Sequence, residues 1–252
     1  MLTRSFIHIP GVGPRTEQRL WQQGLTDWQQ ALAWEKPVSG FSQARWSQAC
    51  DHLRNSMVCL HAGDHRFFAT ALPSVEHWRA WPDFRRRTAF VDIETSGMGP
   101  WAQITVIGVY DGNRTATYVA GDNLEQFAYD LERFGMLVTF NGTCFDLPYL
   151  RRAFPQTSWD QLHCDLRFAL RRLGYRGGLK AIEQRLGVAR ADEVEGLSGE
   201  DAVRLWYEYQ AGNEDSLSRL VQYNAADVEN LQLLMDFAYD RLFARLMEGI
   251  PA

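Results

Sequence analysis

The pattern of apolar and polar positions predicts two units of different character. In the first, apolar residues recur at helical spacing in three segments that Gly and Pro residues separate, at 15–23, 26–34 and 41–55. We therefore expect a small helical module over residues 1–80. Residues 73–87, which contain Pro73 and Pro82, are expected to connect this module to a second domain over residues 84–247.

Short apolar runs that are typical of strands follow the connector. Three strands are expected, at 88–95, 103–110 and 114–120. The turn Asp111-Gly112-Asn113 would join the last two as a hairpin, so the three strands form an antiparallel meander. A helix over 122–134 and an unbroken apolar strand over 136–140 add a buried strand to the same sheet. The result is an α/β fold with a mixed sheet flanked by helices, a layout that several families share.

Two carboxylates interrupt the first strand. In Phe90-Val91-Asp92-Ile93-Glu94-Thr95, successive side chains alternate between the faces of the sheet, so Asp92 and Glu94 project to the same side. Two carboxylates on one face of a buried strand repel each other and resist the loss of water. Divalent cations with oxygen ligands are the usual partners that neutralise such a pair. The strand therefore predicts a cation site.

A third carboxylate follows the strand at 136–140. Asn141-Gly142 predicts a sharp turn at the strand end, and Asp146 then lies in the first turn of the next helix, where a negative charge is favourable. Sites of α/β sheets lie at the ends of central strands, so we expect Asp146 near Asp92 and Glu94.

A fourth carboxylate lies on a late helix. Tyr223 and Asp227 are four residues apart and therefore share one helix face. Along the helix this face continues as an apolar stripe: Leu231, Leu234, Ala238 and Leu242. The stripe would pack on the core and bring Tyr223 and Asp227 to its rim.

Together these segments resemble the three exonuclease motifs of the DEDD superfamily. The matching residues are Asp92-x-Glu94, Asn141-x-x-x-Phe145-Asp146 and Tyr223-x-x-x-Asp227. Tyr223 marks the tyrosine variant, because Gln222 stands where the histidine variant would carry His. Over residues 84–240 the chain also resembles the YprB-type ribonuclease H-like nucleases, in segments such as Ile107-Gly-Val-Tyr-Asp111, His163-Cys-Asp165-Leu166 and Leu205-Trp-Tyr-Glu-Tyr209.

The resemblance implies an RNase H-like fold and hydrolysis of phosphodiester bonds by two metal ions. Two Mg²⁺ or Mn²⁺ would be held by Asp92, Glu94, Asp146 and Asp227. One ion would generate the attacking hydroxide and the other would stabilise the leaving 3′-oxygen. Tyr223 would orient the attacking water. Asp165 is expected to support the site structurally rather than to bind metal.

Nucleic-acid contacts are expected from residues beside these motifs. The candidate substrate-binding residues are Thr95, Asn141, Phe145, Arg151, Arg152 and Lys180. Although the chain carries a net charge of −5, the segment 151–190, which also contains Arg176, has nine Lys or Arg residues against three Asp or Glu residues. A basic segment next to the motifs would attract a phosphate backbone.

A Gly-x-Gly turn opens the first predicted helix. Gly11-Val12-Gly13 would expose backbone N–H groups at the positive end of that helix, which suits a phosphate oxygen. This short segment resembles one helix-hairpin-helix, a hairpin that binds the DNA backbone. Gly11 and Gly13 are therefore further candidates for nucleic-acid contact, and an ordinary tight connection between helices is the alternative.

Composition excludes several other classes of protein. No apolar run approaches the length of about 20 residues that spans a bilayer, and the N-terminus has no signal-peptide core, so we expect a cytoplasmic protein without membrane contact. The four cysteines are Cys50, Cys59, Cys144 and Cys164. They have no short paired spacing, which argues against a zinc ribbon or a disulfide scaffold.

The expected function is that of a metal-dependent 3′-5′ exonuclease acting on nucleic acid, with DNA and RNA both open as substrates. A structure-specific endonuclease is one alternative. A nucleic-acid-binding protein without catalysis, built on a retained nuclease fold, is another.

Overall fold

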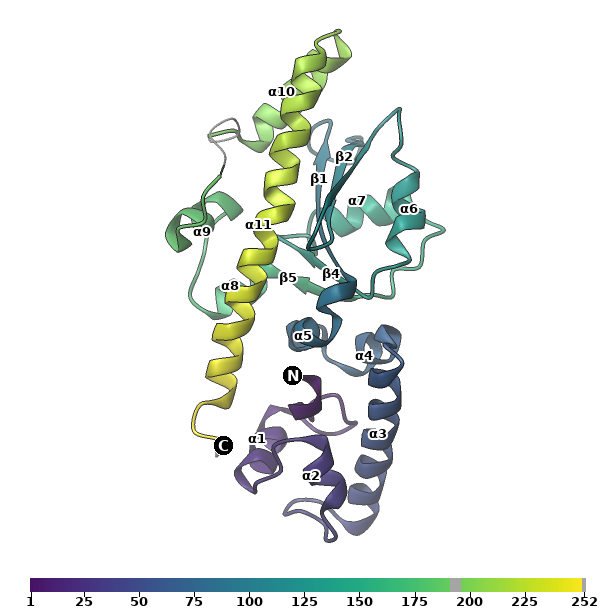
Figure 1. Cartoon of the computed structure of the whole chain (residues 1–252), viewed down its shortest axis with the longest axis vertical. Coiled ribbons are helices and arrows are strands. Elements are labelled where there is room, and N and C mark those ends of the chain that lie inside the picture. The colour runs from purple at the N-terminus through teal and green to yellow at the C-terminus, as the bar shows by residue number, and fades with distance from the viewer. Residues whose placement is uncertain (191–195, 251–252) are drawn as a thin grey trace.

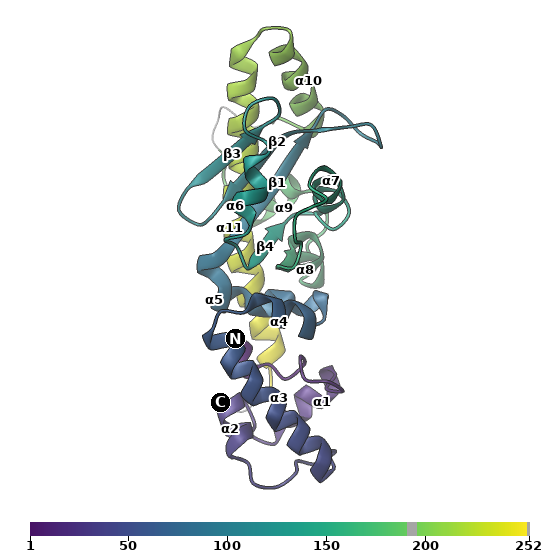
Figure 2. The same cartoon turned by 90° about the vertical axis from the view of Figure 1, so that its right-hand side faces the viewer.

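A five-stranded mixed sheet forms the middle of the molecule, and one long helix runs past it to the N-terminal helices (Figures 1 and 2). The computed structural model describes residues 1–190 and 196–250. The strands are β1 (Thr88–Thr95), β2 (Ile104–Tyr110), β3 (Thr115–Val119), β4 (Met136–Thr139) and β5 (Leu162–Asp165). Their order across the sheet is β3-β2-β1-β4-β5.

The expected mixed sheet is confirmed. β1, β2 and β3 form an antiparallel meander, and β4 lies parallel to β1, with Ala89 opposite Leu137. β5 lies parallel to β4 at the edge. Since β1 has a neighbour on both sides, its carboxylates lie in the middle of the sheet.

Helices cover both faces of the sheet. They are α6 (Gln126–Leu131), α7 (Asp146–Ala153), α8 (Leu166–Arg172), α9 (Leu179–Leu186), α10 (Gly199–Gln210) and α11 (Glu214–Met247). Val91 and Ile93 join a core with α6 and α7 on one face, whereas Phe90 and Val138 join a core with α8 and α11 on the other. Each core lies between the sheet and one layer of helices, and these layers position the site.

α6 is shorter than the helix expected over 122–134. Residues 121–125 form turns instead. The reason is the side chain of Asn123, whose Oδ1 accepts a hydrogen bond from the backbone N–H of Val119 (2.7 Å) and whose Nδ2 donates to the carbonyl of Thr117 (3.1 Å). Side-chain bonds of this kind compete with helical ones and delay the start of the helix.

α11 runs along most of the length of the molecule (Figure 1). Its 34 residues correspond to roughly 50 Å. The first half packs on the sheet and on α10, and the second half reaches the N-terminal part, where Tyr239 packs against Trp78 and Phe243 lies beneath Arg4. In the described part of the chain, no helix is long and apolar enough to cross a membrane.

Short helices build the N-terminal part. They are the 3-10 helix η1 (Leu2–Arg4) and the α-helices α1 (Pro14–Gln22), α2 (Trp28–Ala33), α3 (Gln43–His61) and α4 (His65–Ala71). The first three α-helices are confirmed, and α3 is longer than expected. α4 was outside the expected pattern; the side chain of Asp64 caps it by accepting hydrogen bonds from the N–H groups of Arg66 and Phe67.

The segment 73–87, expected to connect the two units, is helical and partly buried. It forms the 3-10 helix η2 (Ser74–Ala80), the single-turn helix α5 (Trp81–Phe84) and the 3-10 helix η3 (Arg85–Arg87). Trp78 and Trp81 are each 2% exposed, and the Trp81 indole donates to Asp236 on α11 at 3.0 Å. The aromatic residues of the segment are buried because they pack beneath the long helix, whereas residues 73–75, 82–83 and 85–87 are exposed.

A buried ion pair joins the N-terminal helices to this segment. Arg79 on η2 bonds to Glu17 on α1 at 2.8 Å, and both side chains are almost fully buried. The same carboxylate accepts hydrogen bonds from the N–H groups of Phe6 (2.7 Å) and Ile7 (3.0 Å). The surrounding apolar core continues from Leu2 to α11.

Candidate functional site

Asp92 and Glu94 lie on the face of β1 that α11 covers. Phe90, two residues before Asp92, belongs to the core beneath α11, whereas Val91 and Ile93 belong to the core beneath α6 and α7. Glu94 is buried and Asp92 is partly exposed. The alternation expected from the sequence is confirmed, and it directs both carboxylates toward the long helix.

α11 brings a third carboxylate to this pair. Carboxylate oxygens of Asp92, Glu94 and Asp227 lie within 4.8 Å of one another. One turn before Asp227, the buried Asn224 donates from Nδ2 to the Asp92 carboxylate (3.0 Å) and to the Asp92 carbonyl (3.2 Å). These two bonds fix the Asp92 side chain relative to α11. Sequence reasoning did not select Asn224, although it lies inside the last motif.

Gly108 allows α11 to approach β1 and β2 closely. It lies opposite Asp92 in β2. A Cβ at this position would lie 2.1 Å from Oδ1 of Asn224 and 3.2 Å from Cγ1 of Val228. Only glycine leaves the space that the Asn224 side chain occupies, which explains a glycine in the middle of an apolar strand.

Asp146 lies buried beside this trio. α7 begins at Asp146, as expected. The Oδ1 atom of Asp146 accepts a hydrogen bond from the backbone N–H of Ile93 at 3.1 Å. Because Ile93 lies between Asp92 and Glu94, this bond holds the third motif carboxylate against the strand that carries the first two.

The loop between β4 and α7 is held by Asp165. Asn141 takes a positive φ of 67°, which confirms the sharp turn at the strand end. The Asp165 carboxylate accepts hydrogen bonds from the N–H groups of Asn141 (2.8 Å) and Thr143 (3.0 Å). It also caps α8 through the N–H of Arg167 (3.1 Å). Through these contacts the Asp165 side chain fixes the shape of the loop that leads to Asp146.

Burial raises the pKa of all four carboxyl groups. Loss of water is the largest cause at Asp92 and Glu94, and the neighbouring carboxylates raise the pKa further. Burial raises the pKa of Asp146 to about 7. Burial also raises the pKa of Asp227, against the opposing effect of Arg190. A bound dication would reverse this preference for the protonated form.

Tyr223 and Lys180 form a pair at the rim of the cluster. The Lys180 ammonium donates to the Tyr223 hydroxyl at 2.9 Å and lies 4.4 Å from the ring centroid. Burial raises the pKa of Tyr223, and the carboxylates of Asp227 and Glu94 raise it further, so the hydroxyl keeps its proton. The structure thus places Lys180 beside Tyr223, and its contact with a substrate stays a prediction.

Arg190 is a member of the site that sequence reasoning missed. Its guanidinium forms an ion pair with Asp227 and two hydrogen bonds to the buried Glu183, at 2.7 and 2.9 Å. Asn230 on α11 also donates to Glu183 at 3.0 Å. Arg190 belongs to the basic segment 151–190, but no spacing in the sequence distinguishes it from the other arginines there.

Other residues named from the sequence lie in varied surroundings. The buried Thr95 donates from Oγ1 to the carbonyl of Gly97 at 2.7 Å, and the centroid of the Phe145 ring lies 5.0 Å from that of Tyr149.

The two arginines of α7 that the sequence suggested lie in different surroundings. Arg151 is exposed. Arg152 donates to the carbonyls of Pro100 (3.0 Å) and Ala102 (2.6 Å), so its guanidinium holds the loop between β1 and β2.

The Gly-Val-Gly turn lies in the N-terminal helical part rather than at the carboxylate cluster. Gly13 caps α1, and Gly11 takes a φ of 78° with its carbonyl 3.4 Å from an Arg45 nitrogen that donates to it. Among the residues that the structure describes, only the three-residue η1 precedes the turn. The nucleic-acid role of Gly11 and Gly13 stays a prediction.

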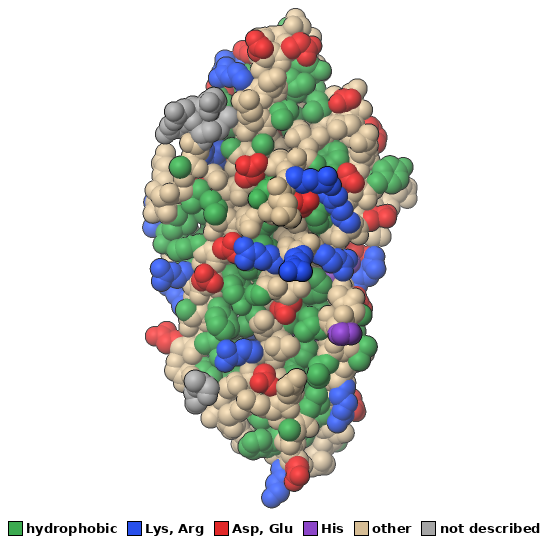
Figure 3. Space-filling model, in the orientation of Figure 1, with side chains coloured by type: hydrophobic (Ala, Val, Ile, Leu, Met, Phe, Trp, Pro, Cys, Tyr) green, Lys and Arg blue, Asp and Glu red, His purple; other side chains and the backbone are tan. Residues whose placement is uncertain are grey.

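Charge is unevenly distributed over the surface. On the face shown in Figure 3, Lys and Arg side chains form a row across the middle of the molecule. The net charge of the whole chain is −5. An acidic protein therefore carries a locally basic surface, which long-range attraction of an anionic partner requires.

Comparison with known proteins identifies the family. The model of the RNase H superfamily RNase_H_2 matches residues 89–239. The chain belongs to the RNase H superfamily. The matched residues include all four motif carboxylates and Tyr223. The five-stranded mixed sheet with its flanking helices is consistent with an RNase H-like fold.

One solved structure is similar in part to this RNase H superfamily protein. It is the family B DNA polymerase from the hyperthermophilic archaeon Pyrobaculum calidifontis, at 15% identity and a TM-score of 0.45. The similarity covers 64% of this chain and 24% of the polymerase, so the chain spans about a quarter of that protein's length. A search of curated proteins finds no match.

The donor set of this RNase H superfamily protein fits a divalent cation. Three carboxylates offer oxygens within 4.8 Å of one another, and Asp146 adds a fourth close by. Lys180 and Arg190 supply two positive charges against these four acidic groups. Hard cations such as Mg²⁺ prefer oxygen ligands of this kind, and the remaining negative charge calls for one.

Proposed function

We propose that this protein is a metal-dependent nuclease of the RNase H superfamily, and specifically a 3′-5′ exonuclease of the DEDD type with Tyr223 as its tyrosine. The observation that carries the proposal is the convergence of Asp92, Glu94 and Asp227 within 4.8 Å, from segments far apart in the sequence. Asp146 stands beside them. Without a cation, these four carboxylates repel one another. With a cation, they can serve as its ligands.

The residues that would hold two Mg²⁺ or Mn²⁺ ions are Asp92, Glu94, Asp146 and Asp227. When bound, such ions activate a water as nucleophile and neutralise charge on the leaving oxygen. Asn224 keeps the Asp92 carboxylate in place through its 3.0 Å bond. Arg190 limits the repulsion between Asp227 and the other carboxylates.

Tyr223 is proposed to orient the attacking water. A lysine ammonium donates hydrogen bonds and accepts none, so the Tyr223 oxygen accepts from Lys180 and its own proton points elsewhere. The hydroxyl can then donate to a water or to a phosphate oxygen, as a positioned acid–base group must. Lys180 thus fixes the direction of the Tyr223 proton.

Substrate contacts are proposed for the residues that surround the cluster. Thr95, Asn141, Phe145, Arg151, Arg152 and Lys180 would contact the strand next to the cleaved bond. Residues 1–80, with Gly11 and Gly13, would form a nucleic-acid-binding module, and residues 84–247 would form the nuclease domain. The substrate is DNA or RNA.

Digestion of end-labelled single- and double-stranded DNA and RNA tests the proposal. With Mn²⁺ or Mg²⁺ we expect products that shorten stepwise from the 3′ end, and with EDTA no cleavage. Asp92→Asn and Asp227→Asn should reduce cleavage to background while circular dichroism stays unchanged. The exposed Asp122 provides a matched control, because Asp122→Asn removes an equal charge outside the cluster.

Other product patterns would lead to other conclusions. Internal cuts would replace the exonuclease with an endonuclease. Binding without cleavage under all metal conditions would identify a protein that retains the fold and not the chemistry. Thermal melting gives an independent readout, since Mn²⁺ should raise the melting temperature of the wild type and leave that of Asp227→Asn unchanged.

A further inference from the structure

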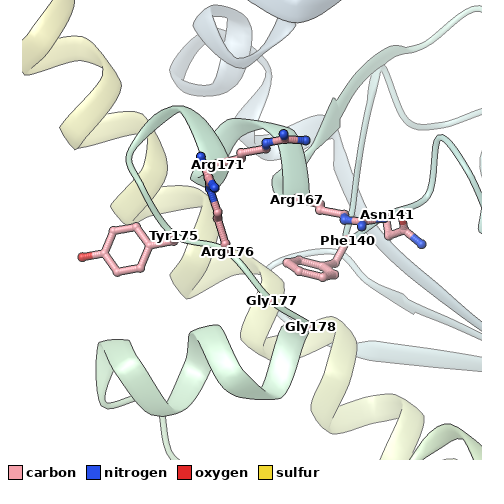
Figure 4. Close-up of a pocket in the computed structure, with 8 residues that line it drawn as sticks. All are labelled: Phe140, Asn141, Arg167, Arg171, Tyr175, Arg176, Gly177 and Gly178. Carbon is pink, nitrogen blue, oxygen red and sulfur yellow. Dashed lines mark hydrogen bonds between the residues drawn. The ribbon is translucent and has the colours of Figure 1, made fainter.

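A basic cavity of about 470 Å³ opens at the end of β4 (Figure 4). Its walls come from Phe140 and Asn141 after β4, from α8, and from the segment 175–178 that leads into α9. No Asp or Glu is among the described residues that line it. None of the four motif carboxylates lines the cavity, and Asn141 is the motif residue that does.

Three arginines line this cavity: Arg167, Arg171 and Arg176. Figure 4 shows the three side chains around the same space, while the Tyr175 ring points away from it. Arg167 donates to the side-chain oxygen of Asn141. In the described residues, Arg171 and Arg176 are exposed and have no acidic partner. Three guanidinium groups around one space repel one another, and an anion would relieve that repulsion.

Two glycines at the start of α9, Gly177 and Gly178, line the same space. Gly177 takes a φ of 123°, a conformation that side chains disfavour, and Gly178 caps the eight-residue helix α9. No side chain of the described residues caps α9 by a hydrogen bond. The first N–H groups of the helix are therefore available to an acceptor. Arginine forks together with free backbone N–H groups match the oxygens of a phosphate group.

The cavity and the carboxylate cluster share two structural elements. Asn141 begins the loop that ends at Asp146, and Gly178 lies two residues before Lys180, which bonds to Tyr223. An anion in the cavity would therefore lie next to the cluster. A strand with repeating phosphates can occupy both places at once, whereas a single small anion can occupy one.

We propose that this cavity binds a backbone phosphate of the substrate strand, adjacent to the bond that is cleaved and not at it. The assignment rests on the proposed nuclease function. It places the path of the strand along α8 and the start of α9. Phe140 in the cavity wall offers an apolar surface to the neighbouring sugar or base.

Removing two charges from the cavity tests the proposal. In Arg171→Gln/Arg176→Gln, we expect the affinity for a fluorescent single-stranded oligonucleotide, measured by anisotropy in EDTA, to fall about tenfold. The slope of log affinity against log salt should decrease by about 0.7 for each lost phosphate contact. Arg86→Gln, which removes one charge outside the cavity, is the control, because Arg86 is exposed and lies before β1, at the opposite end of the strand from the carboxylates.

A small substrate separates this site from the catalytic centre. The p-nitrophenyl ester of thymidine 5′-monophosphate has no second phosphodiester to reach the cavity, so its hydrolysis should be equal in the double variant and the wild type. Oligonucleotide affinity and salt slope equal to those of the wild type would overturn the proposal. Thymidine 5′-monophosphate that binds as tightly as the oligonucleotide, and through the same arginines, would also overturn it in favour of a free nucleotide.

The proposed function can fail without affecting this test. If the wild type hydrolyses neither the ester nor the oligonucleotide with any metal, the nuclease assignment fails. The anisotropy measurement in EDTA needs no turnover, and it still decides whether the two arginines hold a nucleic-acid phosphate.

Discussion

The ammonium group of Lys180 donates a hydrogen bond to the hydroxyl oxygen of Tyr223 at 2.9 Å. The two residues come from α9 and α11, so the contact depends on how these helices pack. It joins a cation from the basic segment to the tyrosine of the last motif. The bond fixes the direction of the Tyr223 hydroxyl proton, which is a testable feature of the proposed chemistry.

Tyr223 and Lys180 should therefore act as a unit in catalysis. We expect Tyr223→Phe and Lys180→Met each to lower kcat about a hundredfold. KM for an oligonucleotide should change little in Tyr223→Phe and rise in Lys180→Met, because Lys180 is also a proposed contact to the strand. The double variant should lose scarcely more than either single variant, because each removes the same oriented proton. Single-turnover rates measure the cycle. Fully additive losses would show that the two side chains act independently.

Asp146 should make the metal-free protein less stable at high pH. Its pKa is about 7 in the folded protein, above the ordinary value of 3.8, so the folded state binds the proton more tightly than the unfolded chain does. The resulting stability is present below about pH 4 and is lost as the pH rises through about 7. Asp146→Asn, which stays neutral, should melt several degrees above the wild type at about pH 8 and near it at about pH 4.

Melting curves in EDTA across this pH range measure the effect of Asp146→Asn. The variant keeps an oxygen that can accept the hydrogen bond from Ile93, so the comparison isolates the charge. Mg²⁺ at about pH 8 should stabilise the wild type and reverse the order of the two melting temperatures. A difference that does not change with pH would contradict the assigned pKa.

Gly108→Ala should destabilise the protein and weaken the site. The new Cβ would lie 2.1 Å from Oδ1 of Asn224, so α11 or the Asn224 side chain must shift. Overpacking of this kind costs about 1–3 kcal/mol of the free energy of unfolding. We also expect weaker Mn²⁺ binding, because Asn224 holds Asp92.

Urea unfolding and Mn²⁺ titration of Gly108→Ala measure both effects. Gly199→Ala is the control, because a Cβ at Gly199 meets no atom within 4 Å and lies at the start of α10. Equal stability of the two variants would show that α11 does not need the glycine for its approach.

Glu17→Ala should be among the most destabilising single changes in the N-terminal part. It would leave the guanidinium of Arg79 buried without one of its two partners and would remove the acceptor for the N–H groups of Phe6 and Ile7. Breaking a buried pair in this way costs about 3–5 kcal/mol. Urea unfolding measures the loss, and the exposed Glu35 supplies the control Glu35→Ala, which should change stability little. Similar midpoints for the two variants would contradict the importance of the pair.

The sequence by itself determined the features that depend on local periodicity. The alternation along Phe90 to Thr95 placed two carboxylates on one face, and the apolar runs located β1 to β4 to within a few residues. The same reasoning placed Asp146 at the start of a helix and Tyr223 and Asp227 on one helix face. Local patterns succeed here because strand and helix geometry repeat every few residues.

Only the tertiary structure decided which distant groups meet. Asn224 and Asp92 are 132 residues apart, and their hydrogen bond exists because Gly108 lets α11 approach the sheet. Arg190 has no distinguishing neighbours in the sequence, and its role at Asp227 follows from the position of α9 beside α11. The burial of Trp78 and Trp81 depends likewise on the second half of α11, because aromatic residues become core only where another element covers them.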